Sequence, residues 1–152
     1  MKEGEAMAGI LVIDDDPAMR RLIARTLTTA GHSVCEAADG REGIALFNQM
    51  LPALVITDIV MPGAEGIETI LELRKVAEGV RILAISGWGS STPSYLDMAT
   101  KLGADIGLSK PFKAEELLAA VERLLVERDS AWNIGRRSKV NLGRRLTLVE
   151  SR

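Results

Sequence analysis

Short apolar runs alternate with longer stretches of helical periodicity from residue 9 to about residue 128. Three runs, over 10–13, 54–56 and 82–85, are almost wholly apolar, which is typical of parallel strands covered on both faces. Two weaker runs, over 33–37 and 105–108, are short or mix polar with apolar residues, which suits strands at the edges of a sheet. The pattern therefore predicts five strands, with the two weaker runs outermost.

Five helices are predicted between and after these strands. Asp16 and Pro17 supply an N-cap residue and a proline at the first position of the first helix, and Gly31 marks its end. The fourth helix, over 94–102, has the weakest pattern. The apolar residues at helical spacing are Met19, Leu22, Ile23 and Leu27 in the first helix, Ile44, Phe47, Met50 and Leu51 in the second, Ile67, Ile70, Leu71 and Ala77 in the third, and Leu117, Leu118, Val121, Leu124 and Leu125 in the fifth.

The order of the elements is (βα)5, and right-handed crossovers then require a parallel sheet with helices on both faces. We predict a flavodoxin-like, doubly wound α/β fold with strand order 2-1-3-4-5. The six-stranded dinucleotide-binding alternative would need a G-x-G-x-x-G motif after the first strand. That place holds three consecutive aspartates, at 14–16, so dinucleotide binding is disfavoured.

Composition and charge fit one globular domain with an appendage: the chain has 152 residues, 47% hydrophobic and 26% charged, and a formal net charge of −2. We divide it into a domain over 8–128 and a basic tail over 129–152. The main domain is acidic, which argues against nucleic-acid binding except through the tail. The tail has one acid, Glu150, and six basic residues: Arg136, Arg137, Lys139, Arg144, Arg145 and Arg152.

Neither a membrane span nor a disulfide framework is predicted. The apolar stretches are far shorter than the ~18 residues that a membrane helix needs. The first residues lack the pattern of a signal peptide, and Cys35 is the single cysteine. We therefore expect a cytoplasmic location and no membrane partner.

Polar residues directly follow the predicted strands. Asp14 and Asp15 follow the first strand, Asp58 the third, Ser86 the fourth and Lys110 the fifth. Ligands of open α/β sheets bind beyond the carboxyl ends of the strands. Because the first, third and fourth strands are neighbours in the predicted sheet, we expect three carboxylates and a hydroxyl group in one pocket.

Such a pocket is electrostatically costly without a cation. Two carboxylates ~4 to 5 Å apart repel by roughly 3 to 4 kcal/mol at an effective dielectric constant of ~20. Hard oxygen ligands without His or Cys favour Mg2+ over zinc or copper. Lys110 adds a point charge suited to a phosphoryl oxygen. Together these groups make a plausible site for phosphoryl transfer to a carboxylate.

The sequence resembles a known family, the receiver domain of two-component response regulators, and in particular its single-domain, chemotaxis-regulator-like members. The resemblance runs from about residue 9 to residue 127, and the ordered set of motifs is specific although each piece alone is weak. The motifs are LVIDDD over 11–16, ITDIVMPG over 56–63 with Gly66 following, ISG over 85–87 and KPF over 110–112.

The resemblance implies a role for each residue of the set. Asp58 would be the phosphoacceptor, taking a phosphoryl group from a phosphohistidine. Mg2+ would be bound by Asp58, Asp15 and the backbone carbonyl of Val60, while Asp14 would hold a metal-bound water. Lys110 would contact the phosphoryl group through a side chain aimed by a cis Lys110-Pro111 bond. After transfer, a hydrogen bond from Ser86 would reach the same group.

The function implied is that of a single-domain response regulator, phosphorylated by a sensor histidine kinase or a histidine phosphotransfer protein. It would signal by protein contact or by onward phosphorelay, and it would be its own substrate rather than a turnover enzyme. A phosphate-independent adaptor is the alternative from another class. A third reading, a Mg2+-dependent phosphoester hydrolase, would need a general acid two residues after Asp58, where Val60 stands.

One position departs from the family pattern. Receiver domains usually carry Tyr or Phe three residues before the lysine, and here that residue is Gly107. The usual switch from a hydroxyl residue to an inward-turning aromatic ring therefore has no side chain to use. Three routes stay open: backbone shifts after the fourth strand, an output role for Trp88, or a protein that mainly relays phosphate.

Overall fold

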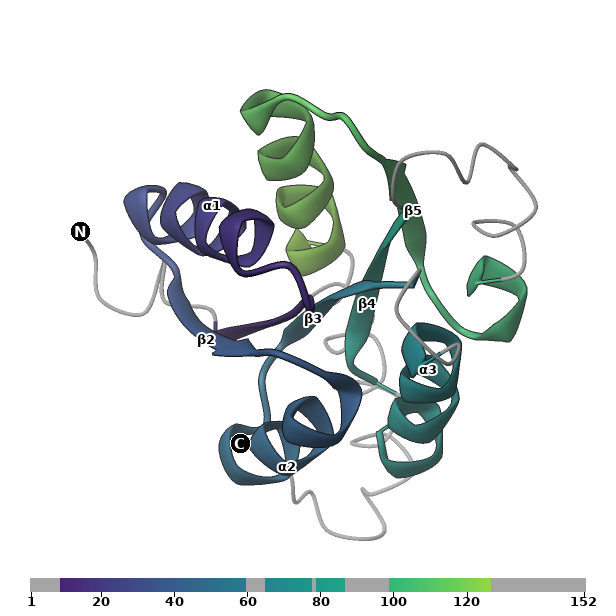
Figure 1. Ribbon diagram of the computed structural model, residues 1–152. Coiled ribbons are helices and arrows are strands. Elements are labelled where there is room, and N and C mark those ends of the chain that lie inside the picture. Colours follow the sequence, from purple (N-terminus) through teal and green to yellow (C-terminus); the bar gives the residue numbers. More distant parts are fainter. Residues whose placement is uncertain (1–8, 60–64, 78, 87–98, 127–152) are drawn as a thin grey trace, which may run out of the picture.

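A five-stranded parallel sheet forms the centre of the computed structural model, which describes residues 9–59, 65–77, 79–86 and 99–126 (Figure 1). The strand order is β2-β1-β3-β4-β5, and every pairing is parallel. This is the predicted fold, and the two weaker runs form the edges as expected. The strands are β1 Gly9–Ile13, β2 Ser33–Ala37, β3 Leu54–Asp58, β4 Arg81–Ser86 and β5 Ile106–Ser109.

Helices cover both faces of the sheet. They are α1 Pro17–Thr29, α2 Gly40–Met50 and α3 Glu65–Val76, with further helical residues over 99–102 and 114–126. In Figure 1, α1 and the helix over 114–126 lie on one side of the sheet, and α2 and α3 lie on the other. Most of the predicted fourth helix lies outside the described residues. Among the helices within them, none has both the length and the apolar character that crossing a bilayer demands.

The ends of α1 follow from the sequence as predicted. Asp16 is the N-cap, and its carboxylate accepts a hydrogen bond of 3.0 Å from the backbone N–H of Ala18. Pro17 is the first helical residue. Gly31, just past the end of the helix, has φ of 103°, a left-handed conformation that glycine adopts without strain. The Asp16 cap and Pro17 thus define the start of α1 directly after β1, and Gly31 lets the chain turn away at its end.

Two apolar cores, one on each face, hold the sheet in place. Successive residues of a strand point to opposite faces, so neighbours along β1 and β3 belong to different cores. One core packs on α2 and α3 and includes Leu11, Ile13, Val55, Ile82, Ala84, Phe47, Ile70 and Leu73. The other packs on α1 and the helix over 114–126 and includes Ile10, Val12, Ile56, Leu83, Ile85, Ile23, Leu27, Leu117, Val121 and Leu124.

Three side chains that helical spacing predicted to face the core are exposed. Leu22 on α1 is 54% exposed and Leu71 on α3 is 40% exposed. Leu51, predicted within the second helix, is instead the left-handed C-cap that follows α2, and it is 70% exposed. The buried face of α1 and of α3 is narrower than its apolar pattern. Ile23 and Leu27 fill the contact between α1 and the sheet, and Ile70 and Leu73 fill the contact between α3 and the sheet.

Candidate functional site

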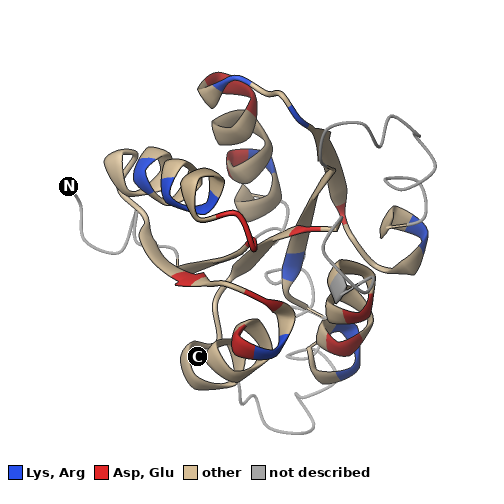
Figure 2. Cartoon of the chain, viewed as in Figure 1, with Lys and Arg blue, Asp and Glu red and all other residues tan. Residues whose placement is uncertain are grey.

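Three carboxylates meet where β1 and β3 end. Asp14 and Asp15 follow β1, and Asp58 is the last residue of β3, the adjacent strand. One carboxylate oxygen from each lies within 4.8 Å of the others. Asp14 and Asp58 are buried, whereas Asp15 is exposed. Figure 2 shows the acidic link between β1 and α1 in red at the centre of the molecule. The structure thus brings together the three acids that the sequence singled out.

Lys110 supplies a buried positive charge to this cluster. Its side chain is 7% exposed, and Nζ lies 3.3 Å from Oδ2 of Asp58 and 3.6 Å from Oδ2 of Asp14. The Lys110-Pro111 peptide bond is cis, as the resemblance implied. The backbone N–H of Lys110 donates a hydrogen bond of 3.1 Å to the carbonyl of Ser86. One ammonium therefore faces two buried carboxylates across the end of the sheet.

Ser86 stands at the matching position of β4. It is the last residue of that strand, it is buried, and it follows Ile85, the register partner of Asp58. The carbonyl of Ile85 accepts a hydrogen bond of 2.9 Å from the N–H of Ile59, which keeps the two strand ends together. The hydroxyl residue thus belongs to the strand next to Asp58. Two other predicted positions, Val60 and Trp88, lie outside the described residues.

Burial decides the electrostatics of Asp14. Loss of hydration raises the pKa of this carboxyl from 3.8 to about 6, and the negative charges of Asp58 and Asp15 add to the rise. A hydrogen bond from the N–H of Asp16 to Oδ1, 2.9 Å long, and the charge of Lys110 oppose it. The carboxylate is therefore costly to keep ionised in a pocket of this charge.

The donor set of this pocket fits Mg2+. Oδ2 of Asp14 is buried and accepts no hydrogen bond. Such an oxygen is ready to bind a cation or a metal-bound water. Lys110 brings one positive charge against the three carboxylates, so the four side chains together are negative when all are ionised. Oxygen donors without His or Cys are the ligands that Mg2+ takes, usually one or two carboxylates with waters.

Gly66 lets α3 begin against the end of β3. A Cβ atom at this residue would lie 2.4 Å from the backbone oxygen of Asp58 and 2.4 Å from Cα of Ile59. Both are backbone atoms, so neither can swing aside. The sequence marked Gly66 as one member of a motif, and the structure supplies the reason: any side chain there would push the helix off the strand that carries Asp58.

Two residues near the site were missed by the sequence reasoning. Arg20 on α1 donates a hydrogen bond of 2.8 Å from Nη1 to the backbone carbonyl of Asp14. Its Nε is 3.1 Å from a carboxylate oxygen of Glu36 on β2. The two residues are far apart in sequence, and no local spacing links them, so no motif could have found the pair.

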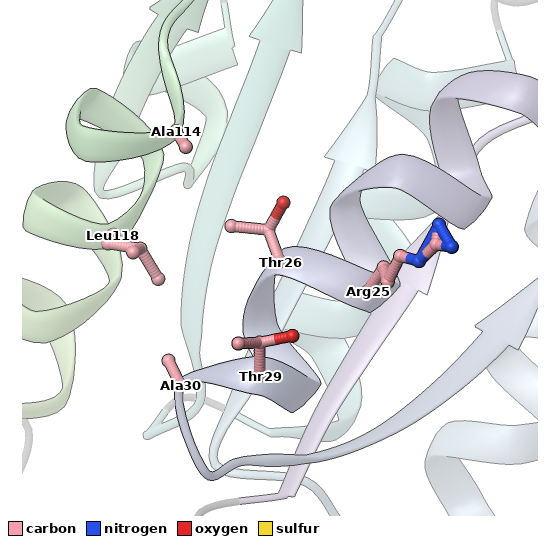
Figure 3. A pocket seen from close by; sticks show the side chains of 6 residues that line it. All are labelled: Arg25, Thr26, Thr29, Ala30, Ala114 and Leu118. Atoms are coloured by element: carbon pink, nitrogen blue, oxygen red, sulfur yellow. The ribbon is translucent and has the colours of Figure 1, made fainter.

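An open groove of about 390 Å³ lies elsewhere, between α1 and the helix over 114–126 (Figure 3). It is lined by Arg25, Thr26, Thr29, Ala30, Ala114 and Leu118. Its wall is mostly apolar and carries none of the carboxylates described above. The reactive groups of the described residues are therefore gathered at the strand ends and not in this groove.

Comparison with known proteins gives the family. The family description "Response regulator receiver domain" matches residues 10–122. The chain belongs to this family. The chain is 39% identical over 116 residues to "Response regulator MprA" of Mycolicibacterium vanbaalenii, over 76% of this chain and 49% of that protein. It is 34% identical over 148 residues to "DNA-binding dual master transcriptional regulator RpaA" of Synechocystis sp., over 96% of this chain and 61% of that protein.

Solved structures agree with this assignment. The crystal structure of the receiver domain of NtrX from Brucella abortus superposes with a TM-score of 0.72 at 34% identity, over 76% of this chain and 97% of that chain. The chain spans between about half and three fifths of the two curated relatives named above. Receiver domains accept phosphoryl groups from histidine kinases or phosphotransfer proteins and generally bind Mg2+ at an acidic pocket.

Proposed function

We propose that Asp58 is the phosphoacceptor of this receiver domain. The observation that carries the proposal is the position of its buried carboxylate at the end of β3. There it lies within 4.8 Å of the carboxylates of Asp14 and Asp15 and 3.3 Å from the ammonium of Lys110. The Asp58 carboxylate and the incoming phosphoryl group are both anionic and repel each other. The ammonium of Lys110 and a cation held by the acidic side chains would offset that repulsion, so this carboxylate is suited to attack phosphorus.

The transfer follows from these residues. A carboxylate oxygen of Asp58 forms a bond to the phosphorus atom while the nitrogen–phosphorus bond of a phosphohistidine donor breaks, and the donor imidazole leaves. Lys110 exchanges its contact with Asp58 for a contact with a phosphoryl oxygen. The hydroxyl of Ser86 donates a hydrogen bond to another oxygen of the same group.

Mg2+ completes this site in the proposal. Asp15, Asp58 and the backbone carbonyl of Val60 would hold the ion, and Asp14 would hold one of its waters. When bound, Mg2+ neutralises charge that builds up as the phosphoryl group moves. The orphaned Oδ2 of Asp14 supports this part, because it lacks a hydrogen bond that a metal-bound water would donate.

The wider role extends the family assignment. We propose a receiver over 8–128, with a basic tail over 129–152 that lies outside the described residues, acting in the cytoplasm as a single-domain response regulator. Its phosphate comes from a sensor histidine kinase or a histidine phosphotransfer protein. Output passes by protein contact or onward phosphorelay, and nucleic acid enters only if the tail binds it. Since Asp58 itself is modified, the protein is a phosphoacceptor and not a turnover enzyme.

A phosphate-independent adaptor is the second candidate. It is favoured by Gly107 of β5, which pairs in register with Ala84 of β4 and has no side chain to report a change at Ser86. A docking protein would need no such reporter. The cluster of Asp14, Asp58 and Lys110 weighs against this function, since a docking protein gains nothing from three buried charges that are costly to maintain.

Intact mass after incubation with acetyl phosphate and Mg2+ tests the proposal. We expect the wild-type protein to gain the mass of one phosphoryl group, ~80 Da. Neither an Asp58→Asn variant nor a sample with a chelator should gain it. An unmodified wild-type protein would instead favour the adaptor, provided that beryllofluoride with Mg2+ also leaves its amide NMR spectrum unchanged.

A further inference from the structure

The peptide that joins Asp14 to Asp15 is held from outside the acidic cluster. Its carbonyl oxygen, that of Asp14, accepts the 2.8 Å hydrogen bond from Nη1 of Arg20. A peptide unit is planar, so fixing its oxygen fixes the orientation of the whole plane. The two acidic side chains project from the two ends of that plane. A contact to this oxygen therefore constrains the backbone from which both carboxylates project.

Arg20 is itself held in place. Its side chain is 16% exposed, and Nε donates a 3.1 Å hydrogen bond to Glu36. Glu36 is the register partner of Val12, two residues before Asp14. The guanidinium thus joins the first turn of α1, the end of β1 and the edge strand β2. A planar guanidinium can make these two contacts at once in a fixed geometry, whereas a lysine ammonium on a flexible stem cannot reproduce both.

The other hydrogen bonds described for this loop do not involve the carbonyl of Asp14. The carbonyl of Asp16 accepts from the N–H of Arg20 at 2.9 Å, and the carboxylate of Asp16 accepts from the N–H of Ala18 at 3.0 Å. The N–H of Asp14 donates to the carbonyl of Ala37 at 3.1 Å, and Oδ1 of Asp14 accepts from the N–H of Asp16 at 2.9 Å. Arg20 therefore supplies the contact, among those described, that acts on the carbonyl of the peptide between the two acids.

We infer that Arg20, oriented by Glu36, is a positioning residue that sets the Asp14–Asp15 peptide in the orientation needed to bind Mg2+. The inference rests on the proposed function, since it concerns the metal site of the same phosphoacceptor. Arg20 touches neither Asp58 nor a carboxylate of the cluster through any contact described above. It acts through the backbone of Asp14, and its effect is a matter of geometry and not of charge.

Geometry and charge predict opposite results for one substitution. Removing a positive charge near an acidic site strengthens Mg2+ binding if charge alone matters. Loss of a residue that orients metal ligands weakens binding, typically by about 10-fold or more. We therefore expect Arg20→Met to raise the Mg2+ dissociation constant about 10-fold. Arg20→Lys keeps the charge but not the fork of donors, and we expect an increase of about 3-fold.

The titration is followed by amide NMR of the full chain with Mg2+ alone. Arg21 is exposed and adjacent on α1, so Arg21→Met and Arg21→Lys are matched controls and should bind Mg2+ as tightly as wild type, or slightly more tightly. A second readout needs no metal: hydrogen exchange of the Asp16 amide should accelerate several-fold in both Arg20 variants and in neither control. Urea unfolding of each variant separates these effects from a general loss of stability.

The inference is overturned if both Arg20 variants bind Mg2+ at least as tightly as wild type with unchanged exchange at Asp16. If Arg20→Met does not fold, the lysine variant decides alone, since its charge is that of wild type. Acetyl phosphate labelling of wild type runs alongside. If wild type is labelled and the Arg20 variants bind Mg2+ and exchange the Asp16 amide as wild type does, only the positioning role is refuted. If wild type itself is not labelled, the result counts against the proposed function.

Discussion

Replacing Asp14 by asparagine should stabilise the metal-free protein. Burial raises the pKa of this carboxyl to about 6, from 3.8 when it is solvated. The folded protein therefore binds the proton more tightly than the unfolded chain does. The free energy of unfolding falls as the pH rises from about 4 to about 6, and the loss is complete above that range. Asparagine imitates the neutral form at every pH.

The magnitude follows from that pKa difference, which corresponds to about 3 kcal/mol at pH 7. The amide oxygen of an asparagine can still accept the hydrogen bond from the N–H of Asp16, as Oδ1 does now. The attraction between Asp14 and Lys110 is already contained in the raised value. We therefore expect Asp14→Asn to gain about 2 to 3 kcal/mol at pH 8 and almost nothing at pH 4.

Urea unfolding between pH 4 and pH 8, with a chelator present, measures this effect. Asp15→Asn is the matched control: its carboxylate is exposed, so its variant should stay within about 0.5 kcal/mol of wild type. Mg2+ should narrow the gap. An ion at 100 times its dissociation constant stabilises wild type by about 2.7 kcal/mol, and at the same concentration it stabilises less a variant that lacks the carboxylate proposed to hold a metal-bound water. The carboxylate of Asp14 thus lowers stability when Mg2+ is absent and contributes to stability when Mg2+ is bound.

Two results would contradict this prediction: an Asp14→Asn variant no more stable than wild type at pH 8, or a variant whose stability still falls between pH 4 and pH 6. Either result would mean that Asp14 is well solvated or well paired in the folded protein. It would also remove the electrostatic argument that this pocket needs a second cation.

Three further changes have expected outcomes. Gly66→Ala should cost about 1 to 3 kcal/mol in urea unfolding and slow labelling of Asp58 by acetyl phosphate, because its Cβ would meet backbone atoms of β3; wild-type values for both would contradict the close approach. Lys110→Met should tighten Mg2+ binding in an NMR titration yet abolish labelling, and weaker binding would contradict the placement of its ammonium. Asp105→Asn should lower the free energy of unfolding in urea by about 2 to 3 kcal/mol, because it weakens the ion pairs of 2.9 Å with Arg74 and Arg81. Mg2+ binding should not change, and altered binding would contradict the separation of Asp105 from the acidic cluster.

Much of the fold could be predicted because it depends on local patterns. The runs over 10–13, 54–56 and 82–85 are apolar at every position, which is typical of strands buried on both faces. The rule that ligands lie beyond the strand ends then gave Asp14, Asp15, Asp58, Ser86 and Lys110 without any coordinates. The same patterns could not separate Asp14 from Asp15. Adjacent residues leave a strand in different directions, so one is buried and the other exposed.

What the sequence could not reveal depends on contacts between distant residues. The pairing of Arg20 with Glu36 joins a helix to an edge strand, and neither residue has a local partner that would mark it. Leu22 has the spacing of a core residue, yet it is 54% exposed because its neighbours already fill the space above the sheet. The close approach of Gly66 to β3 likewise arises only when helix and strand are packed.

Locating the phosphoryl group in the chain tests whether Asp58 is the phosphoacceptor. The wild-type protein is incubated with acetyl phosphate and Mg2+, reduced with borohydride, which converts an aspartyl phosphate to homoserine, and sequenced by tandem mass spectrometry. We predict homoserine at position 58 and none there when a chelator replaces Mg2+. Homoserine at Asp14 or Asp15 with Asp58 intact, or no conversion in the wild-type protein, would contradict the account.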